Sequence, residues 1–265
     1  MSDTPQWHQV NVSFPDWDHA EQTAAAHIAP HLDAEAATWF FIRKHPCWRI
    51  RYQPASGTRA STEHQLDELA AAGCITGWTR VIYEPEAFAF GGPQAMDTAH
   101  RLFHADSRCL LGYLRDQPAG GHRREISLML CSIMMRAASQ DLFEQGDVWA
   151  RVAAYRKAPP PVGPDRPGLP GKVRHLITAD TGSWMRHGAA LGRHDVWAAA
   201  YEAAGRDLAG LNAAGRLHRG LRDILAHHVI FAWNRAGLPY KTQSVLADAA
   251  KTAVFGPGPA TAGTR

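Results

Sequence analysis

The chain is poor in the features that mark several large classes of protein. Its 265 residues include four cysteines, at positions 47, 74, 109 and 131, and no two of them form a CxxC pair. We therefore expect reduced thiols. The N-terminus has no basic start followed by an apolar run, so we expect no signal peptide. No apolar run approaches the roughly 20 residues that span a bilayer. These absences favour a cytoplasmic protein that does not enter a membrane.

The net charge and the histidine content exclude fewer classes of protein than these absences do. The formal net charge of +3 does not require a nucleic-acid partner, and we expect none, but it is compatible with an acidic peptide. The 15 histidines invite a metal site, and His100 and His104 do have helical spacing. No HExxH motif accompanies them. We therefore expect histidines with polar or site roles, no metal and no cofactor.

The order of predicted elements changes along the chain. Alternating apolar and polar residues predict strands at 7–14, 38–44, 48–53 and 75–86, with helices at about 16–32, 62–73 and 93–104. Helices alone are predicted afterwards, at 110–114, 125–139, 141–155, 183–191, 195–208, 217–235 and 241–253. This order indicates an α+β fold, with a largely antiparallel sheet and a predominantly helical second half.

We expect a single domain over residues 1–255. The segment 157–172, KAPPPVGPDRPGLPGK, is a proline- and glycine-rich connection of the kind that is often flexible. The small, polar tail 256–265 is expected to be disordered.

Three arginines lie in the predicted hairpin that His45-Pro46-Cys47 closes. Arg49 and Arg51 share one face of their strand, because side chains alternate along a strand. Arg43 ends the partner strand, so several guanidinium groups could converge on one sheet face. This pattern fits either salt bridges on a solvated face or a clamp for an anion or carbonyl group.

The stretch from Arg80 to Ser107 carries more polar groups than a structural crossover needs. Tyr83 and Glu86 end a strand that breaks at Gly91-Gly92, and glycines there permit positive φ or close backbone approach. Pro85 indicates an edge position or a bulge. His100 lies on the following helix, and Asp106-Ser107 is typical of a cap or turn before the next helix. A plain strand-to-helix turn would explain the same motif.

The stretch HHVIFAWNRAGLPY forms the last polar cluster. His227 and His228 are adjacent on a long predicted helix, so one of them should face inward, because successive helical positions point about 100° apart. Asn234 and Arg235 close the helix before Gly237. An arginine in a last helical turn is favourable against the helix dipole whatever its function.

Together these motifs resemble a known family, the thiopeptide-type bacteriocin biosynthesis domain. The order FFIRK and WRIRY, then YEPEAFAFGG with AH-x-LF-x-ADS, then HHVIFAWNRAGL matches over roughly residues 5–250. This domain is the C-terminal half of class I lanthipeptide dehydratases and also occurs as a stand-alone protein. The resemblance implies the fold of their glutamate-elimination domain. It also implies one of two chemistries: glutamate elimination from glutamylated serine or threonine, or pyridine formation from two dehydroalanines.

Departures from the family pattern favour the second chemistry. Eliminating members usually have Y-x-x-E-x-x-R-Y-G-G, whereas this chain has Ala89 at the arginine position and Phe90 at the following tyrosine. Eliminating members also usually have HMxxNR, and here only Asn234 and Arg235 of that motif match. The chain thus lacks the arginine of the first motif and the histidine of the second. Their loss implies an apolar, aromatic pocket, which suits a neutral, ring-rich peptide better than a glutamyl ester.

Of the two branches of the family, the chain is most similar to the pyridine synthases, and the resemblance therefore implies that activity. Such an enzyme joins two dehydroalanines of a leader-bearing azole peptide in a formal aza-[4+2] cycloaddition, then expels water and the leader peptide. Its partners would be that ribosomally made precursor peptide and other enzymes of the pathway. The alternatives are a glutamate-elimination subunit and a non-catalytic, leader-binding subunit. Proposed catalytic residues are Tyr83, Glu86, His100, His228 and Tyr240. Proposed substrate-binding residues are Arg43, Arg49, Arg51, Phe90, Asn234 and Arg235.

Overall fold

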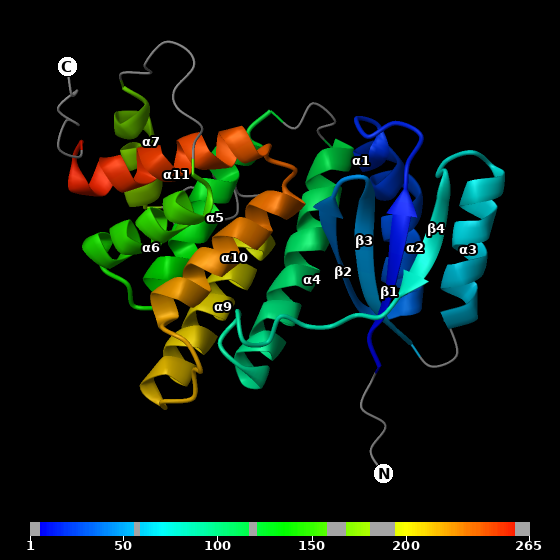
Figure 1. Ribbon diagram of the computed structural model, residues 1–265, viewed down its shortest axis with the longest axis horizontal. Helices are drawn as coiled ribbons and strands as arrows, with labels where there is room; N and C mark the ends of the chain where they lie inside the picture. Colours follow the sequence, from blue (N-terminus) through cyan, green and yellow to red (C-terminus); the bar gives the residue numbers. More distant parts are fainter. Residues whose placement is uncertain (1–5, 56–58, 117–120, 158–167, 181–193, 258–265) are drawn as a thin grey trace, which may run out of the picture. The chain divides into compact units, whose positions relative to one another are not determined.

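The computed structural model describes residues 6–55, 59–116, 121–157, 168–180 and 194–257 (Figure 1). The predicted helix 183–191, most of the proline- and glycine-rich segment and most of the tail lie outside these residues. The chain divides into two compact units. Unit 1 comprises residues 1–86, 99–123 and 234–237, and unit 2 comprises 87–98, 124–233 and 238–265. None of the described helices is long and apolar enough to cross a membrane. The single domain stays a prediction.

Unit 1 contains a four-stranded antiparallel sheet. Its strands are β1 (His8–Ser13), β2 (Ala36–Lys44), β3 (Cys47–Pro54) and β4 (Gly77–Val81), in the order β2-β3-β1-β4 (Figure 1). The predicted hairpin is confirmed as β2 and β3. The predicted strand 75–86 is too long, because pairing with β1 ends at Val81. β4 is an edge strand, as Pro85 indicated, and residues 82–86 leave it without regular secondary structure.

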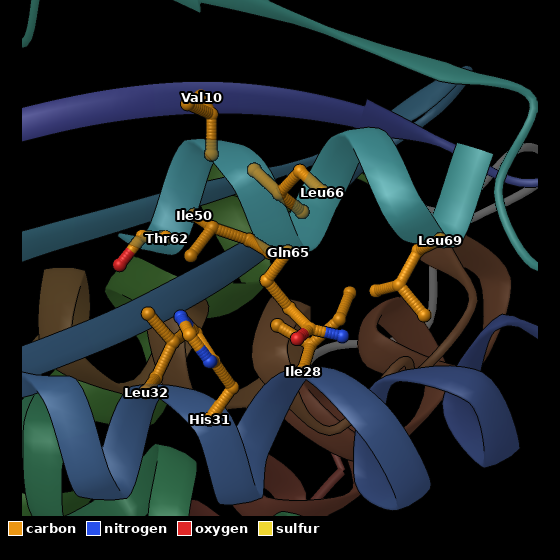
Figure 2. Close-up of a pocket in the computed structure, with 9 residues that line it drawn as sticks. All are labelled: Val10, Ile28, His31, Leu32, Ile50, Thr62, Gln65, Leu66 and Leu69. Carbon is orange, nitrogen blue, oxygen red and sulfur yellow. The ribbon is translucent and has the colours of Figure 1, made fainter. Parts of the chain in front are cut away.

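One face of this sheet is buried under the helices that follow β1 and β3. A helical segment runs from Ala20 to Glu35 as α1 (Ala20–Thr23), the π-helix η1 (Ala24–Ile28) and α2 (Ala29–Glu35), and α3 spans Arg59–Ala71. Figure 2 shows how side chains of η1, α2 and α3 meet Val10 of β1 and Ile50 of β3 around a small cavity. Its volume is about 10 Å³, so this side of the sheet is closely packed core.

The other face of the sheet carries a polar row. Register places Phe40, Arg51, Gln9 and Val81 side by side across all four strands. Arg49 lies two residues along on the same face, because side chains alternate along a strand. This confirms that Arg49 and Arg51 share a face. It is the face against which residues of α4 from position 99 onward pack, through Phe40.

Helix α4 is continuous from Pro93 to Asp116. The prediction of a turn at Asp106-Ser107 is therefore wrong. Both side chains are buried within the helix, and their polar groups have tertiary partners in place of local ones. Asp106 pairs with Arg235, and the Ser107 hydroxyl accepts a hydrogen bond from the backbone N–H of Phe41, at 3.3 Å.

Unit 2 is helical. Its helices are α5 (Arg123–Ala137), α6 (Leu142–Tyr155), α7 (Leu169–Thr178), α9 (Asp195–Ala213), α10 (Leu221–Arg235) and α11 (Tyr240–Phe255). Asp141 and Glu144 form a capping box at the start of α6. The first four residues of helix α7, 169–172, were predicted to belong to an irregular connection. The helix forms there because Pro170 occupies its first turn, where a missing N–H costs nothing.

Candidate functional site

The centre of the candidate site is a hydrogen bond between Tyr83 and His100, both in unit 1. The Tyr83 hydroxyl lies 2.8 Å from Nε2 of His100. Tyr83 is in the segment after β4, and His100 is on α4. The sequence predicted both residues as catalytic candidates without predicting that they touch. Either group can donate in this pair, depending on the histidine tautomer. We call Tyr83 and His100 the dyad.

Aromatic rings enclose the dyad. The ring of Trp7 lies 4.6 Å from that of His100, tilted by 38°, and 5.8 Å from that of Tyr83. Phe40 lies 5.8 Å from the His100 ring and 6.0 Å from the Tyr83 ring. Contacts at these distances partly bury the dyad and restrict the orientation of both rings.

Arg51 brings a positive charge to this enclosure. Its side chain is 8% exposed, and its Nε donates to Oε1 of Gln9 at 2.8 Å. Its guanidinium carbon lies 4.9 Å from the Tyr83 ring and 5.3 Å from the Phe40 ring. Arg51 is thus a buried cation held by a neutral amide and two aromatic faces.

Burial dominates the protonation of these groups. It raises the pKa of Tyr83 to about 12, although the nearby charge of Arg51 acts in the opposite direction. It lowers the pKa of Arg51 to about 10, with Tyr83 and Glu86 opposing and Arg49 and Arg235 adding to the effect. At neutral pH Tyr83 therefore keeps its proton and Arg51 keeps its charge.

Arg235 lies deepest among these residues. Its side chain is fully buried, with Nε donating to Oδ2 of Asp106 at 2.5 Å and the guanidinium carbon 4.5 Å from the Phe103 ring. Its two terminal nitrogens have no hydrogen-bond partner among the described residues. The neighbouring Asn234 belongs to the same unit. A buried cation with unsatisfied donors is costly to desolvate, so its carboxylate partner Asp106 matters, and its charge adds positive potential to the site.

Arg43 does not join Arg49 and Arg51, so the prediction that the three converge on one face is wrong. Register pairs Arg43 with Trp48, which places it on the opposite face of the sheet. There it is stacked on Trp48 at 4.6 Å and bonded to Glu21, which also accepts from Arg123 at 2.7 and 2.9 Å. Its role in substrate binding stays a prediction.

Unit 2 contains the remaining predicted residues. Phe90 is fully buried, and its ring lies 4.9 Å from that of His228, 5.3 Å from that of His227 and 4.9 Å from that of Phe231. Phe90 therefore packs among aromatic and imidazole rings, and its role in substrate binding stays a prediction. Tyr240, at the start of α11, is half exposed and has Arg156 over its ring.

The turn before α4 is held by close backbone contacts, as its two glycines suggested. Gly91 and Gly92 have φ of 97° and 106°. A side chain at Gly92 would meet the imidazole of His218 at 2.8 Å. The backbone N–H of His218 donates to the Gly91 carbonyl at 2.9 Å. A guanidinium does reach this turn: Arg219 donates to the Ala89 carbonyl at 3.2 Å and to the Tyr155 hydroxyl at 2.7 Å.

Sequence reasoning missed Trp7 and Gln9. Both lie in the first strand region, and nothing in their local pattern distinguishes them from ordinary strand residues. For Gln9, its register opposite Arg51 would have been a signal, whereas Trp7 precedes the first paired residue and has none. Within the described part of the chain, no three His, Cys, Asp or Glu side chains gather as they would around a metal ion.

Comparisons with known proteins agree with the fold. The profile of the family described as "Lantibiotic biosynthesis dehydratase C-term" matches residues 7–254. Among solved structures, the tRNA-dependent lantibiotic dehydratase MibB from Microbispora sp. 107891 is 18% identical, with a TM-score of 0.59. The match covers 96% of this chain but only 28% of MibB. TsrL is 16% identical, with a TM-score of 0.56, and the match covers 94% of this chain and 95% of TsrL. No curated protein matches the sequence.

Proposed function

Because the chain belongs to the lantibiotic biosynthesis dehydratase C-terminal family, we propose that it modifies a ribosomally made precursor peptide, specifically as a pyridine synthase. The reaction joins two dehydroalanines of one azole-bearing chain in a formal aza-[4+2] cycloaddition. Loss of water and of the leader peptide as a carboxamide then gives an aromatic pyridine at the junction of a macrocycle.

The Tyr83–His100 hydrogen bond carries this proposal. Before cycloaddition, one backbone amide must become its iminol tautomer, which moves a proton from nitrogen to oxygen. That shift needs a donor for the oxygen and an acceptor for the nitrogen proton, held together. Tyr83 stays protonated below its pKa of about 12 and serves as the donor, while the imidazole of His100 is the acceptor.

Arg51 stabilises the amide oxygen during this tautomerisation. Its charge is held by Gln9 and by two aromatic rings, so its other donors can face the amide oxygen where negative charge develops. Preorganised donors of this kind stabilise such charge strongly in a buried site. Glu86, which acts electrostatically on both Tyr83 and Arg51, orients this pair.

The turn at Ala89 and Phe90 supports pyridine formation over glutamate elimination. Phe90 fills its surroundings with an aromatic ring packed on His227, His228 and Phe231. The nearby guanidinium of Arg219 is bonded to a backbone carbonyl and to a tyrosine hydroxyl, not held ready for a glutamyl carboxylate. At this turn the chain therefore has a buried, packed aromatic ring where eliminating members have a tyrosine.

Mass spectrometry of the cognate precursor peptide, carrying azoles and two dehydroalanines, tests the proposal. Incubation with the protein alone should give a macrocycle that absorbs as a pyridine, together with free leader peptide ending in a carboxamide. Loss of glutamate from a glutamylated precursor, without any macrocycle, would establish elimination as the function. Peptide binding without turnover, in a pathway indifferent to changes at Tyr83 and His100, would establish a non-catalytic role.

A further inference from the structure

A groove opens where strands β1 and β4 separate. The two strands pair from Ser13 and Gly77 to Gln9 and Val81. Beyond this last pair, a groove of about 490 Å³ lies between residues 6–8 on one side and residues 80–83 with Pro85 on the other. Its volume is in the range of about 300–1,000 Å³ that is usual for ligand-binding clefts.

The groove is bordered by exposed apolar side chains. Val81 is 40% exposed and Ile82 is 86% exposed. Proteins usually cover or charge the edges of their sheets, because a bare edge pairs with other chains. This fold does so at its other edge, where His104 and Ser107 of α4 accept the N–H groups of Trp39 and Phe41. At the β4 edge, Trp78 and Arg80 are bonded to Asp67 and Glu63 of α3, but Val81 and Ile82 stay exposed and apolar, which indicates a surface used for binding.

The groove is continuous with the dyad. Tyr83 is one of its lining residues, and so is Trp7. Trp7 also lies against the His100 ring, at 4.6 Å, and against the Tyr83 ring, at 5.8 Å. A ligand in the groove would therefore touch the same indole ring that orients both members of the dyad.

The chemistry of the lining fits an uncharged peptide segment. Among the described residues no carboxylate lines the groove, and its cation, Arg80, is bonded to both carboxylate oxygens of Glu63 at 2.6 Å. β4 is the last strand of the sheet, and an extended chain can add to such an edge. Peptides bind sheet edges in this way, with main-chain hydrogen bonds for affinity and apolar pockets for alternate side chains.

We infer that this groove binds the extended core segment next to the reacting residues of the precursor peptide, with Trp7 as the contact between bound peptide and dyad. The inference rests on the proposed function for the identity of the peptide. Val81, Ile82 and Pro85 receive its apolar side chains. Trp7 is a positioning residue: it holds His100 against Tyr83 while it touches the substrate.

The affinity for a peptide that cannot react tests this inference separately from the proposed reaction. The probe is a fluorescein-labelled precursor core with alanine at both reacting positions, so that it binds but cannot react, and anisotropy gives its Kd. Ile82→Asp places a carboxylate in the groove at a highly exposed position and should weaken binding at least tenfold. The control Val196→Asp changes a similar aliphatic residue, 69% exposed on α9, and should leave the Kd within twofold of wild type.

Trp7→Leu tests the positioning role. It should weaken probe binding and, with the reactive precursor, lower kcat as well as raise KM. It should also displace the His100 imidazole signals in the NMR spectrum, and Trp7→Phe should restore most of both properties. A raised KM with unchanged kcat and unchanged His100 signals would overturn the positioning role.

The groove and the proposed function fail separately. If Ile82→Asp binds the probe like wild type while Tyr83→Phe abolishes macrocycle formation, the groove assignment is wrong and the function stands. If Ile82→Asp loses binding but wild-type protein forms no pyridine, the groove assignment stands and the function is wrong. If Ile82→Asp changes only the sedimentation behaviour of the protein, the groove contacts a second copy of the chain, and the inference fails.

Discussion

The protonation of Tyr83 decides what the dyad can do. A tyrosine whose pKa is raised to about 12 by burial donates hydrogen bonds at neutral pH and does not become a nucleophilic phenolate. Its neighbour Arg51 keeps its charge, because a pKa lowered to about 10 is still well above neutrality. The site therefore combines a neutral donor, Tyr83, with a cation, Arg51. This pair suits the negative charge that develops on the amide oxygen during tautomerisation.

Removal of the Tyr83 hydroxyl should abolish most of the proposed activity without unfolding the protein. Tyr83→Phe keeps the ring contacts with Trp7 and Phe40 but removes the partner of His100. General acid–base groups contribute about 10²- to 10⁴-fold, so we expect at least a 100-fold lower single-turnover rate by mass spectrometry. The control Tyr113→Phe removes a hydroxyl that accepts from the His122 N–H and should retain the rate. A wild-type rate for Tyr83→Phe would exclude the dyad.

Arg51 should be more important for function than for stability. It is buried beside a neutral amide, and replacing a buried charge by an apolar side chain of similar size is often neutral or stabilising. We expect Arg51→Met to leave the urea unfolding free energy unchanged or raise it by about 1–2 kcal/mol, while turnover falls at least tenfold. Arg108→Met, at a half-exposed arginine paired with Asp33, should change neither. A loss of several kcal/mol for Arg51→Met would make this arginine structural.

Helix α4 closes one edge of the sheet with side chains. His104 and Ser107 accept the outward N–H groups of two alternate residues of β2, Trp39 and Phe41, so backbone donors that a neighbouring strand would otherwise pair are satisfied by a helix. Nδ1 of His104 lies 3.1 Å from the Trp39 nitrogen and 2.9 Å from the Trp39 carbonyl oxygen, so it accepts from the N–H in one tautomer and donates to the carbonyl in the other. Burial lowers the pKa of His104, and the nearby Arg108 adds to that effect.

The protein should therefore lose stability in mild acid through His104. Its pKa is lowered in the folded state, so the folded protein binds fewer protons than the unfolded one below the ordinary histidine pKa of about 6.5. The contribution is fully present above that pH and is lost as pH falls towards the folded-state pKa. Urea unfolding at pH 7.5 and 5.0 should show a larger loss for wild type than for His104→Gln, whose amide oxygen can still accept from Trp39.

His64→Gln provides the matched control, because His64 is exposed on α3 and its replacement should leave the wild-type pH dependence intact. His31, whose pKa is also lowered by burial, contributes equally to all three proteins. Equal losses for wild type and His104→Gln would show that His104 does not titrate with unfolding.

The elements that sequence predicted well are those with strong local signals. The β2–β3 hairpin follows from alternating apolar residues around a tight turn, and α6 from a capping box at Asp141. Asp106 and Ser107 misled the prediction because such residues favour caps, and their true partners, Arg235 and the Phe41 amide, lie more than 60 positions away. Local sequence carries no record of such tertiary partners.

In the candidate site too, features with a local sequence signal were predicted and features set by tertiary contacts were not. The resemblance identified Tyr83, His100 and Arg51 individually, and strand alternation correctly placed Arg49 with Arg51 on one face. Arg43 was misplaced because its face depends on the register of β2 against β3, which the hairpin turn sets and residue counting alone left open. Trp7 had no signal at all, since its importance comes only from contact with His100.

At the scale of the whole molecule, the chain passes repeatedly between its two units. Unit 1 takes residues 1–86 and 99–123 from the first half of the chain and then only 234–237 from near its end. That short return supplies Arg235 to Asp106 and the Ala236 carbonyl to Arg123, at 3.1 Å. A cut after residue 123 would therefore remove both of these partners from an otherwise complete unit.

The same substitution should have opposite effects in the whole chain and in the fragment 1–123. In the whole chain, Asp106→Leu leaves the fully buried Arg235 without its carboxylate, and breaking a buried pair costs about 3–5 kcal/mol. In the fragment, Arg235 is absent, so Asp106→Leu removes a buried carboxylate that has already lost this ion pair. Urea titrations followed by circular dichroism should show a lower midpoint in the first case and a higher one in the second. A change of the same sign in both would mean that the buried pair does not tie residues 234–237 to unit 1, and that α4 and the sheet hold this unit together alone.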